Sequence, residues 1–348
     1  MPDLIFLWPG FPDYAARLVR RVIDAGHDVA VVATSPSVPI EGMERSLGRK
    51  VHWIEPNTEV SFASLGLKPP RTLFQGGYHV PAFNALGREV RMAGGRAILM
   101  ADNNWTNSLR QRIFDPLRHR LLFTRRFSGV LVPGASGVRW ARRMGYAGPV
   151  EMGMYGADPS LFFAGPPLER RPKRLFFVGQ FVPRKNVLGL AEAFTCVASR
   201  FPDWTLVLCG SGEQHCAIPQ HPQIVVEGFV QPAQLATKLR AARAFVLPSL
   251  EEHWGLVVHE AALSGAALVL STAVGAAEDL AGPENSVIFS PGDSRALAHA
   301  LATVMAWDDS RFAAAERASL DLAKAFSPDR FAAAVAELNR AVLARVTV

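Results

Sequence analysis

Cysteines and long apolar runs are both scarce in this sequence. The three cysteines, Cys196, Cys209 and Cys216, are odd in number and lack the spacing of a zinc site or a disulfide framework. Unbroken apolar runs such as 4–8 fall far short of the ~20 residues that a membrane-spanning helix needs. Residues 1–3 carry an acid where a secretory signal has a basic segment. We therefore expect a reduced, cytoplasmic protein.

The composition also lacks the charge excess of a disordered chain. Charged residues make up 20% and hydrophobic residues 49% of the 348 residues, which excludes a disordered or fibrous protein. A single core rarely serves so long a chain, because domains usually span roughly 100–200 residues. The length therefore predicts two domains.

The net charge of +6 is unevenly distributed along the chain. Residues 1–165 contain 20 Lys and Arg against 13 Asp and Glu, whereas residues 166–348 contain 17 against 18. The basic character therefore belongs to the first half alone. Such an asymmetry indicates an anionic partner for that half.

Short apolar runs alternate with amphipathic stretches from the first residues onward. A predicted strand at 4–8, a helix at 14–25 and a strand at 28–33 form a βαβ unit whose strands are too apolar to face water. The pattern recurs in the first half as strand, helix, strand and helix at 97–100, 108–127, 129–132 and 135–144. These elements predict a parallel sheet covered by helices on both faces.

A Pro- and charge-rich stretch at 165–173 is typical of an interdomain linker. A second series of strands and helices follows it, at 174–178, 187–200, 205–209, 224–227, 233–242, 244–247, 256–264 and 267–270. We therefore predict two Rossmann-like α/β domains, at 1–165 and 174–326. Because parallel sheets bind ligands beyond the carboxyl ends of their strands, we expect the domains to face a central cleft.

The stretch from Pro248 to Glu260 carries the strongest chemical signal. It follows a predicted buried strand and begins a helix near Gly255, whose first free N–H groups can bind an anion. Glu260 lies one turn into the helix and leans back toward its N-terminus, while Glu252 lies in the loop ahead. Two carboxylates beside a phosphate site would contact hydroxyl groups. A helix with a capping acid and a solvated Glu260 is the competing interpretation.

This stretch resembles the C-terminal motif of retaining family-4 glycosyltransferases, which have the GT-B fold. The matching residues are Pro248-Ser249, Glu252, Trp254-Gly255 and Glu260-Ala261. Further motifs similar to those of the family lie, in order, at 155–162, 177–186, 208–213 and 227–230. The likeness is strong over 128–300 and looser over 1–127.

The resemblance implies transfer of a sugar, with retention, from a nucleoside-diphosphate sugar to a hydroxyl acceptor, as in bacterial glycan, polysaccharide or glycolipid assembly. It also implies that the C-terminal helix, at 327–348, crosses back to pack on the first domain. Lys185 would bind the donor diphosphate, Glu260 the ribose hydroxyls and Glu252 the transferred sugar. The implied donor-binding residues are Gly10, Gly179, Arg184, Lys185, Gly228, Gly255, Leu256, Val257 and Glu260. Arg184 would supply a charge that the family carries at the position of Gln180.

The implied catalytic residues are Glu252 and Asp102. Asp102 follows a predicted strand where many relatives have a histidine, so it would orient or deprotonate the acceptor hydroxyl. Capping of the following helix, in competition with Asn104 or Asn107, is an equal alternative. His79 and Asn103 are candidates for acceptor binding, and a packing role for His79 stays open.

No Asp-x-Asp motif is present, which favours a metal-independent hexosyltransferase without a cofactor. Two other functions remain open: a nucleotide-sugar epimerase or hydrolase of the same fold, and a non-catalytic protein that binds a nucleotide-sugar. A dinucleotide dehydrogenase is not expected, because Gly210-Ser211-Gly212 is followed by His215 and not by a third glycine.

One stretch of the first domain, 110–143, is both basic and apolar. Its arginines are Arg110, Arg112, Arg118, Arg120, Arg125, Arg126, Arg139, Arg142 and Arg143. They would bind an anionic acceptor, either a lipid-diphosphate-linked glycan or the inner membrane surface, which would make the protein peripheral to the membrane. Alternatively, they are the solvated face of a core helix. Nucleic acid is not an expected partner, because no aromatic platform accompanies the charge.

Overall fold

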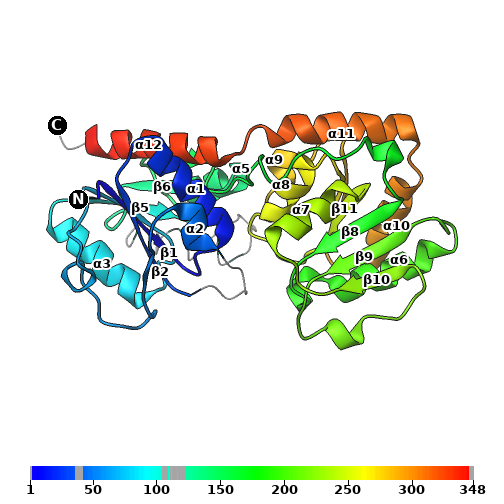
Figure 1. Ribbon diagram of the computed structural model, residues 1–348, viewed down its shortest axis with the longest axis horizontal. Coiled ribbons are helices and arrows are strands. Elements are labelled where there is room, and N and C mark those ends of the chain that lie inside the picture. Colours follow the sequence, from blue (N-terminus) through cyan, green and yellow to red (C-terminus); the bar gives the residue numbers. More distant parts are fainter. Residues whose placement is uncertain are drawn as a thin grey trace. The chain divides into compact units, whose positions relative to one another are not determined.

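The computed structural model describes residues 2–35, 42–103 and 123–344, together with Leu109, Gln111 and Pro116. Contacts divide the chain into two units: residues 1–156 with 326–348 form the first, and residues 157–325 form the second. Each unit is built on a parallel β-sheet covered by helices (Figure 1). The predicted pair of Rossmann-like α/β domains is therefore confirmed.

The first unit contains a seven-stranded sheet of order β3-β2-β1-β4-β5-β6-β7. Its strands are β1 (Leu4–Trp8), β2 (Val29–Ala33), β3 (His52–Trp53), β4 (Thr72–Gln75), β5 (Arg96–Met100), β6 (Gly129–Val132) and β7 (Val150–Met152). The covering helices are α1 (Asp13–Asp24), α2 (Met43–Leu47), α3 (Pro81–Met92), α5 (Ala135–Arg143) and α12 (Pro328–Ala344). The central strands are buried on both faces, which explains their unbroken apolar sequence.

The C-terminal helix α12 belongs to the first unit, although the chain crosses the second unit before reaching it. It lies along α1, as the red and blue helices of Figure 1 show, and over β5, β6 and β7. Its apolar side, with Phe331, Leu338 and Val342, is buried in the core beneath α1. Asn339 accepts a hydrogen bond of 2.6 Å from the hydroxyl of Thr72 in β4. Apolar packing and this polar contact together hold the helix on the sheet.

The second unit contains a six-stranded sheet of order β10-β9-β8-β11-β12-β13. Its strands are β8 (Arg174–Val178), β9 (Thr205–Cys209), β10 (Ile224–Glu227), β11 (Ala244–Leu247), β12 (Ala267–Ser271) and β13 (Ser286–Phe289). Its helices are α6 (Val187–Ala198), α7 (Pro232–Arg240), α8 (Leu256–Leu263), α9 (Ala277–Leu280), α10 (Ser294–Met305) and α11 (Asp309–Ala323). Because β8 and β11 are neighbours, the loops that follow them emerge side by side.

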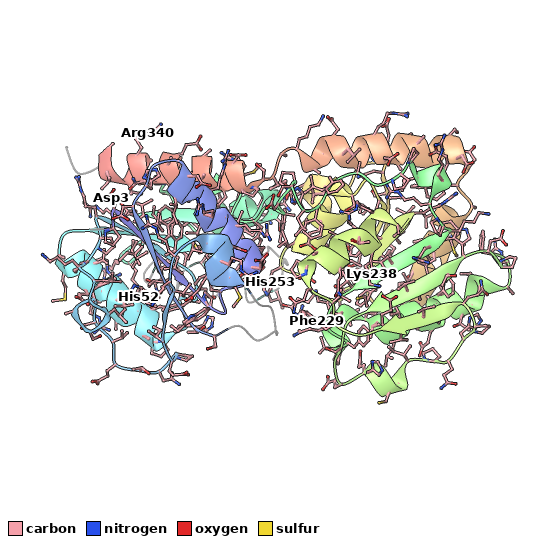
Figure 2. All side chains as sticks on the ribbon, in the orientation of Figure 1. Asp3, His52, Phe229, Lys238, His253 and Arg340 are labelled. Carbon is pink, nitrogen blue, oxygen red and sulfur yellow. The ribbon has the colours of Figure 1, made fainter. Side chains whose placement is uncertain are left out.

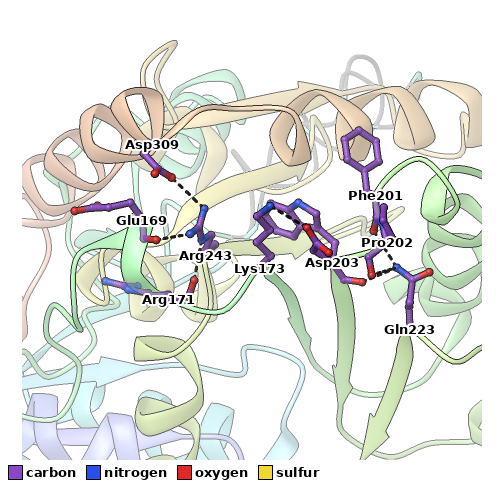
Figure 3. A network of polar contacts seen from close by, with 10 residues as sticks. Glu169, Arg171, Lys173, Phe201, Pro202, Asp203, Gln223, Arg243 and Asp309 are labelled. Atoms are coloured by element: carbon purple, nitrogen blue, oxygen red, sulfur yellow. Dashed lines mark hydrogen bonds and ion pairs between the residues drawn. The ribbon is translucent and has the colours of Figure 1, made fainter.

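Two buried arginines attach the predicted linker to the second unit (Figure 3). The Arg171 guanidinium donates to the Ala242 carbonyl at 3.1 Å and to Glu316 at 2.9 Å. Arg243 donates to the Arg171 carbonyl at 2.8 Å and to the Glu169 carbonyl. Contacts of this kind, with carbonyl and carboxylate oxygens, compensate for the burial of the two charges. The stretch that the sequence predicts to be a linker is therefore an anchored part of the second unit.

The unit boundaries differ from those expected from the sequence at 157–165, which pack with the second unit and not the first. The Ala157 amide donates to His259 at 2.9 Å, and Arg240 donates to the Leu161 carbonyl at 3.3 Å. These bonds are made to α8 and α7, far along the sequence, so a local composition shift does not reveal them.

Most of the predicted strands and helices are present within two or three residues of their expected bounds. The sequence analysis missed the helices α2, α3 and α9 and the edge strands β3 and β7. The two edge strands have only two and three residues and carry too little periodicity to be recognised. The predicted helix at 108–127 lies mostly outside the described residues. Among the residues that are described, no helix is both long and apolar enough to cross a membrane.

The close contact between α12 and β6 yields a stability prediction. A Cβ atom at Gly129 would lie 3.1 Å from a methyl group of Val342 and 3.3 Å from one of Leu338. We expect Gly129→Ala to lower the free energy of unfolding by about 1–3 kcal/mol in urea titrations, through overpacking. The double variant Gly129→Ala with Val342→Ala should lose less than the sum of the two single changes. Additive losses would contradict the proposed contact.

Candidate functional site

Helix α8 begins at a glycine with a backbone conformation that side chains disfavour. Gly255 has φ of +90°, and a Cβ atom there would lie 3.2 Å from the Glu252 side chain. The Val258 amide donates to the Gly255 carbonyl at 2.9 Å and begins the helical hydrogen bonding. The preceding amides, at Gly255, Leu256 and Val257, therefore have no acceptor one turn back and can bind an anion.

The loop ahead of α8 is held against the segment that follows β12. The Trp254 side chain is 1% exposed, its carbonyl accepts from the Ala276 amide at 2.8 Å, and its indole N–H donates to Asp279 at 3.4 Å. The Glu252 carbonyl accepts from the Gly275 amide at 3.2 Å. The backbone around Glu252 is thus fixed before any ligand arrives.

Glu252 and Lys185 form an ion pair, although 67 residues separate them. The Lys185 ammonium donates to the Glu252 carboxylate, and each side chain is 11% exposed. Arg184 lies 4.0 Å from the same carboxylate, and its carbonyl accepts from the Leu250 amide at 2.8 Å. The adjacent loops after β8 and β11 are therefore joined by an ion pair and by a backbone hydrogen bond. Sequence reasoning assigned Lys185 and Glu252 to different parts of a ligand and did not foresee that they bind each other.

Glu260 lies one turn into α8 and is half-buried. Burial raises the pKa of its carboxyl to about 8. In the part of the chain that the structure describes, this carboxyl has no hydrogen-bond or ion-pair partner. A half-buried acid whose pKa is about 8 is mostly protonated at neutral pH, and a ligand can supply hydrogen-bond partners.

Two glycine-containing loops pass each other at the carboxyl ends of β8 and β9. A Cβ atom at Gly210 would lie 1.9 Å from the Gly179 carbonyl, and one at Gly212 would lie 2.5 Å from the Phe181 carbonyl. The Phe181 amide donates to the Ser211 carbonyl at 2.8 Å. Only glycine permits so close an approach of the two backbones, which explains the Gly-x-Gly spacing.

The loop after β10 contains Gly228 and an exposed aromatic residue. Nothing lies within 4 Å of a Cβ atom placed on Gly228, and its carbonyl accepts from the Cys209 thiol at 3.3 Å. Phe229 is 41% exposed. Figure 2 labels Phe229 together with His253, which follows β11, and Lys238, which pairs with Glu227 at 2.7 Å.

The first unit places its candidate residues after three neighbouring strands. Gly10, with φ of +59°, follows β1 and donates its amide to the Thr34 hydroxyl at 2.9 Å. His79 follows β4 and is exposed, with its ring beside Tyr78, so it is no buried packing residue. Asp102 and Asn103 follow β5. Carboxyl ends of adjacent parallel strands meet at one edge of a sheet, so these loops share that edge.

Asp102 has a partner that the sequence did not indicate. The Tyr155 hydroxyl donates to the Asp102 carboxylate at 3.2 Å, and the Tyr155 ring packs edge-on against Tyr14. Burial, followed by the neighbouring Tyr14 and Asp102, holds the pKa of Tyr155 well above its usual range. Tyr155 therefore remains a hydrogen-bond donor to Asp102. The competing caps for the next helix, Asn104 and Asn107, lie outside the described residues.

The basic stretch 110–143 is only partly described. Arg110, Arg112, Arg118 and Arg120 lie outside the described residues, whereas Arg125, Arg126, Arg139, Arg142 and Arg143 are exposed. Arg142 donates to the carbonyls of Tyr146 and Gly148, at 3.1 and 2.8 Å, and so closes the end of α5. At least one arginine of the stretch thus has a structural role.

A further arginine cluster joins this stretch to α3. Arg91 donates to the Arg126 carbonyl at 3.5 Å. Burial, together with the charges of Arg126 and Arg88, lowers the pKa of Arg91. Within the described ranges none of these three arginines forms an ion pair. They leave a concentration of positive charge that a bound anion would stabilise.

No group of three or more side chains suited to a metal ion is present in the described parts of the chain.

Comparisons with known proteins relate this chain to a described family. The family model described as glycosyl transferases group 1 matches residues 172–306. The phosphatidyl-myo-inositol mannosyltransferase of Mycolicibacterium smegmatis is 25% identical over 334 residues, which span 89% of this chain and 84% of that relative. The group 1 match thus covers most of the second unit, and the likeness to the mannosyltransferase extends into the first.

Two solved structures share the fold over nearly their whole length. Sucrose-phosphate synthase from Thermosynechococcus elongatus superposes with a TM-score of 0.73 at 18% identity, over 99% of this chain and 100% of that one. HepE of Anabaena, crystallised with UDP and glucose, superposes with a TM-score of 0.73 at 16% identity, over 97% and 99% of the two chains. Residues 172–306 are therefore a glycosyl transferases group 1 domain, in a chain that has the GT-B fold and is homologous to glycosyltransferases.

Proposed function

We propose that the protein transfers a sugar, with retention and without a metal ion, from a nucleoside-diphosphate sugar to a hydroxyl acceptor. The observation that carries the proposal is the arrangement around the N-terminus of α8. There Lys185 and the first amides of the helix could bind the phosphate, and Glu252 could bind the sugar. The Glu260 carboxyl, which has no partner among the described residues, could bind the ribose. Arg184 and Gly179 lie in the loop after β8, and Gly228 lies in the loop after β10.

The donor diphosphate is the ligand proposed for Lys185 and the amides of Gly255, Leu256 and Val257. A compact ammonium and a helix N-terminus both favour negative charge, and they would stabilise the charge that develops on the leaving diphosphate. Arg184, whose side chain is 46% exposed, can add a second cation. These groups supply positive charge without a metal ion, which supports the proposed metal independence.

Glu252 would change partners when the donor binds. In the structure its carboxylate neutralises Lys185. A diphosphate that takes over the ammonium would release the carboxylate to accept hydrogen bonds from the hydroxyls of the transferred sugar. The ion pair therefore keeps both side chains in place before the donor arrives and avoids an unpaired charge in a largely buried site.

The acceptor is proposed to bind the first unit. Asp102 would orient or deprotonate the attacking hydroxyl, with Tyr155 fixing the carboxylate and His79 and Asn103 contacting the rest of the acceptor. The relative from Mycolicibacterium is named for transfer to a phosphatidyl-inositol lipid, so we propose a glycan or lipid-linked acceptor in polysaccharide or glycolipid assembly. The donor would be a hexose on UDP or another nucleoside diphosphate, since HepE was crystallised with UDP and glucose.

The proposed roles of Glu252 and Lys185 can be separated by kinetics. Glu252→Gln should lower kcat by about tenfold to a hundredfold, the value of a hydrogen bond to a charged group, while UDP binds as tightly as before or tighter. Lys185→Met should instead weaken UDP binding. Glu251→Gln, at the exposed neighbouring position, is the control and should change neither quantity. Loss of UDP affinity in the Glu252 variant would contradict this division.

Glu260 predicts a pH dependence of nucleotide binding. The free carboxyl keeps its proton up to a pKa of about 8, whereas ribose hydroxyls that donate to it favour the carboxylate. Binding should therefore release a proton, and UDP affinity should rise from pH 6.5 to 8.5. The free energy of unfolding of the free protein should fall as the pH rises from 4.5 to about 8, because only the unfolded state releases this proton there.

Glu260→Gln is the matched variant, since its amide does not titrate. Isothermal titration calorimetry in two buffers of different ionisation enthalpy counts the protons released. The proton release and the steeper rise in affinity should both disappear in the variant. An unchanged pH profile would mean that Glu260 does not contact the nucleotide.

The transfer reaction itself is tested with UDP-glucose and GDP-mannose as donors and phosphatidylinositol as an acceptor probe, with and without excess EDTA. We expect one donor to be consumed only when an acceptor is present, with an α-linked product by NMR and no loss of rate in EDTA. Release of free sugar without acceptor would favour a hydrolase. Abolition by EDTA would overturn the proposed metal independence.

We also propose that the arginine cluster of Arg88, Arg91 and Arg126, together with the stretch 110–143, contacts an anionic membrane surface. The double variant Arg88→Glu with Arg126→Glu should reduce co-sedimentation with phosphatidylglycerol vesicles at least tenfold, because each arginine near such a surface contributes about 1 kcal/mol. The charge-matched control is Arg295→Glu with Arg317→Glu, at exposed positions of the second unit. Equal binding of both variants would leave the cluster as a solvated face.

A further inference from the structure

A histidine next to Glu260 takes no part in the proposed chemistry. His259 lies on α8 and is fully buried. Its Nδ1 accepts a hydrogen bond of 2.9 Å from the Ala157 amide, and its Nε2 lies 2.9 Å from the Ala323 carbonyl. Both polar atoms of the ring are thus bound to backbone groups that are distant in sequence.

These two bonds determine the state of the ring. Because Nδ1 accepts a proton from an amide, the ring hydrogen must be on Nε2, which donates to the Ala323 carbonyl. Burial lowers the pKa of His259 to about 4. The neutral Nε2–H tautomer therefore persists at neutral pH, and both bonds persist with it.

The two partners of His259 lie near opposite ends of the sequence of the second unit. Ala157 is the first residue of that unit, directly after Gly156. Ala323 is the last residue of α11, two residues before the unit ends at Ala325. One side chain therefore ties helix α8 to the place where the chain enters the second unit and to the place where it leaves.

We propose that His259 is a positioning residue that couples the nucleotide-binding helix α8 to both connections between the units. The coupling rests on the proposed function, since the ligand is a nucleotide bound at the N-terminus of α8 and at Glu260. A ligand that orders α8 also orders His259, the residue next to Glu260. Through its two hydrogen bonds, His259 then orders the backbone at Ala157 and at Ala323. Binding in one unit thereby restrains the two segments that lead to the other.

The chemistry of amides allows each bond to be tested alone. The side-chain oxygen of asparagine can take the place of Nδ1, so His259→Asn keeps an acceptor for Ala157 and loses the donor to Ala323. The side-chain nitrogen of glutamine can take the place of Nε2, so His259→Gln keeps the donor and loses the acceptor. His259→Leu removes both and leaves a buried amide and a buried carbonyl without partners.

Hydrogen–deuterium exchange at single-residue resolution measures the tether without any ligand. In His259→Gln the Ala157 amide should exchange about threefold to tenfold faster than in the unchanged protein, while Lys324 and Ala325 at the end of α11 stay protected. In His259→Asn the pattern should be reversed. His221→Leu is the control, since His221 also binds a backbone amide of this unit but contacts neither segment. Equal exchange in the Asn and Gln variants would overturn the tether.

A second arm adds UDP or GDP at saturation, with binding measured separately by calorimetry. In the unchanged protein and in His259→Asn, the nucleotide should slow exchange of the Ala157 amide by a further factor of about three or more, within the range of one hydrogen bond. In His259→Gln and His259→Leu it should not. Binding without that extra protection would overturn the coupling, whereas failure of any nucleotide to bind would overturn the proposed function and leave the ligand-free result to decide the tether.

Discussion

The contact between Lys185 and Glu252 is the interaction on which the candidate site depends. Both side chains are about nine-tenths buried, and burial of either charge without its partner would cost free energy. Their pairing joins the loop after β8 to the loop after β11, and the backbone bond from Leu250 to Arg184 reinforces the link. The loop that leads into α8 and the Lys185 ammonium are thus held together.

The surroundings of α8 show the same use of buried polar contacts. Both ring nitrogens of His259, on this helix, form hydrogen bonds. The hydroxyl of Ser264, the residue after the helix, donates to the Glu260 carbonyl at 2.9 Å. Against this background the Glu260 carboxyl stands out. It has no partner in the described part of the chain, and desolvation raises the pKa of the carboxyl to about 8. A fold that satisfies the neighbouring polar groups and leaves this one without a protein partner indicates a position for a ligand.

Two buried arginines, Arg171 and Arg243, stabilise the second unit and are not part of the candidate site. Arg171 and Arg243 bind mainly backbone carbonyls and hold the segment before β8 on the second unit. Each guanidinium donates to three protein acceptors and is largely buried. The cluster of Arg88, Arg91 and Arg126 differs, because none of the three forms an ion pair within the described residues and the charges of Arg126 and Arg88 help to lower the pKa of Arg91. An arginine that is buried among hydrogen-bond acceptors anchors the neighbouring backbone. An arginine without such acceptors can bind an anion.

Much of the fold was predictable because it depends on local patterns. The apolar strands, the amphipathic helices, Gly255 at the start of α8 and Glu260 one turn later all follow from residues within a few positions of one another. The strand order was not predictable from such patterns, and it is the placement of β8 beside β11 that brings Lys185 to Glu252 across 67 residues. The partners of His259 and of Asp102, the anchoring of 157–171 and the return of α12 to the first unit likewise depend on contacts between distant segments. Sequence by itself determined the elements and the chemistry available at their ends; tertiary structure decided which of those ends meet, because pairing of strands and burial of charge are properties of the packed chain.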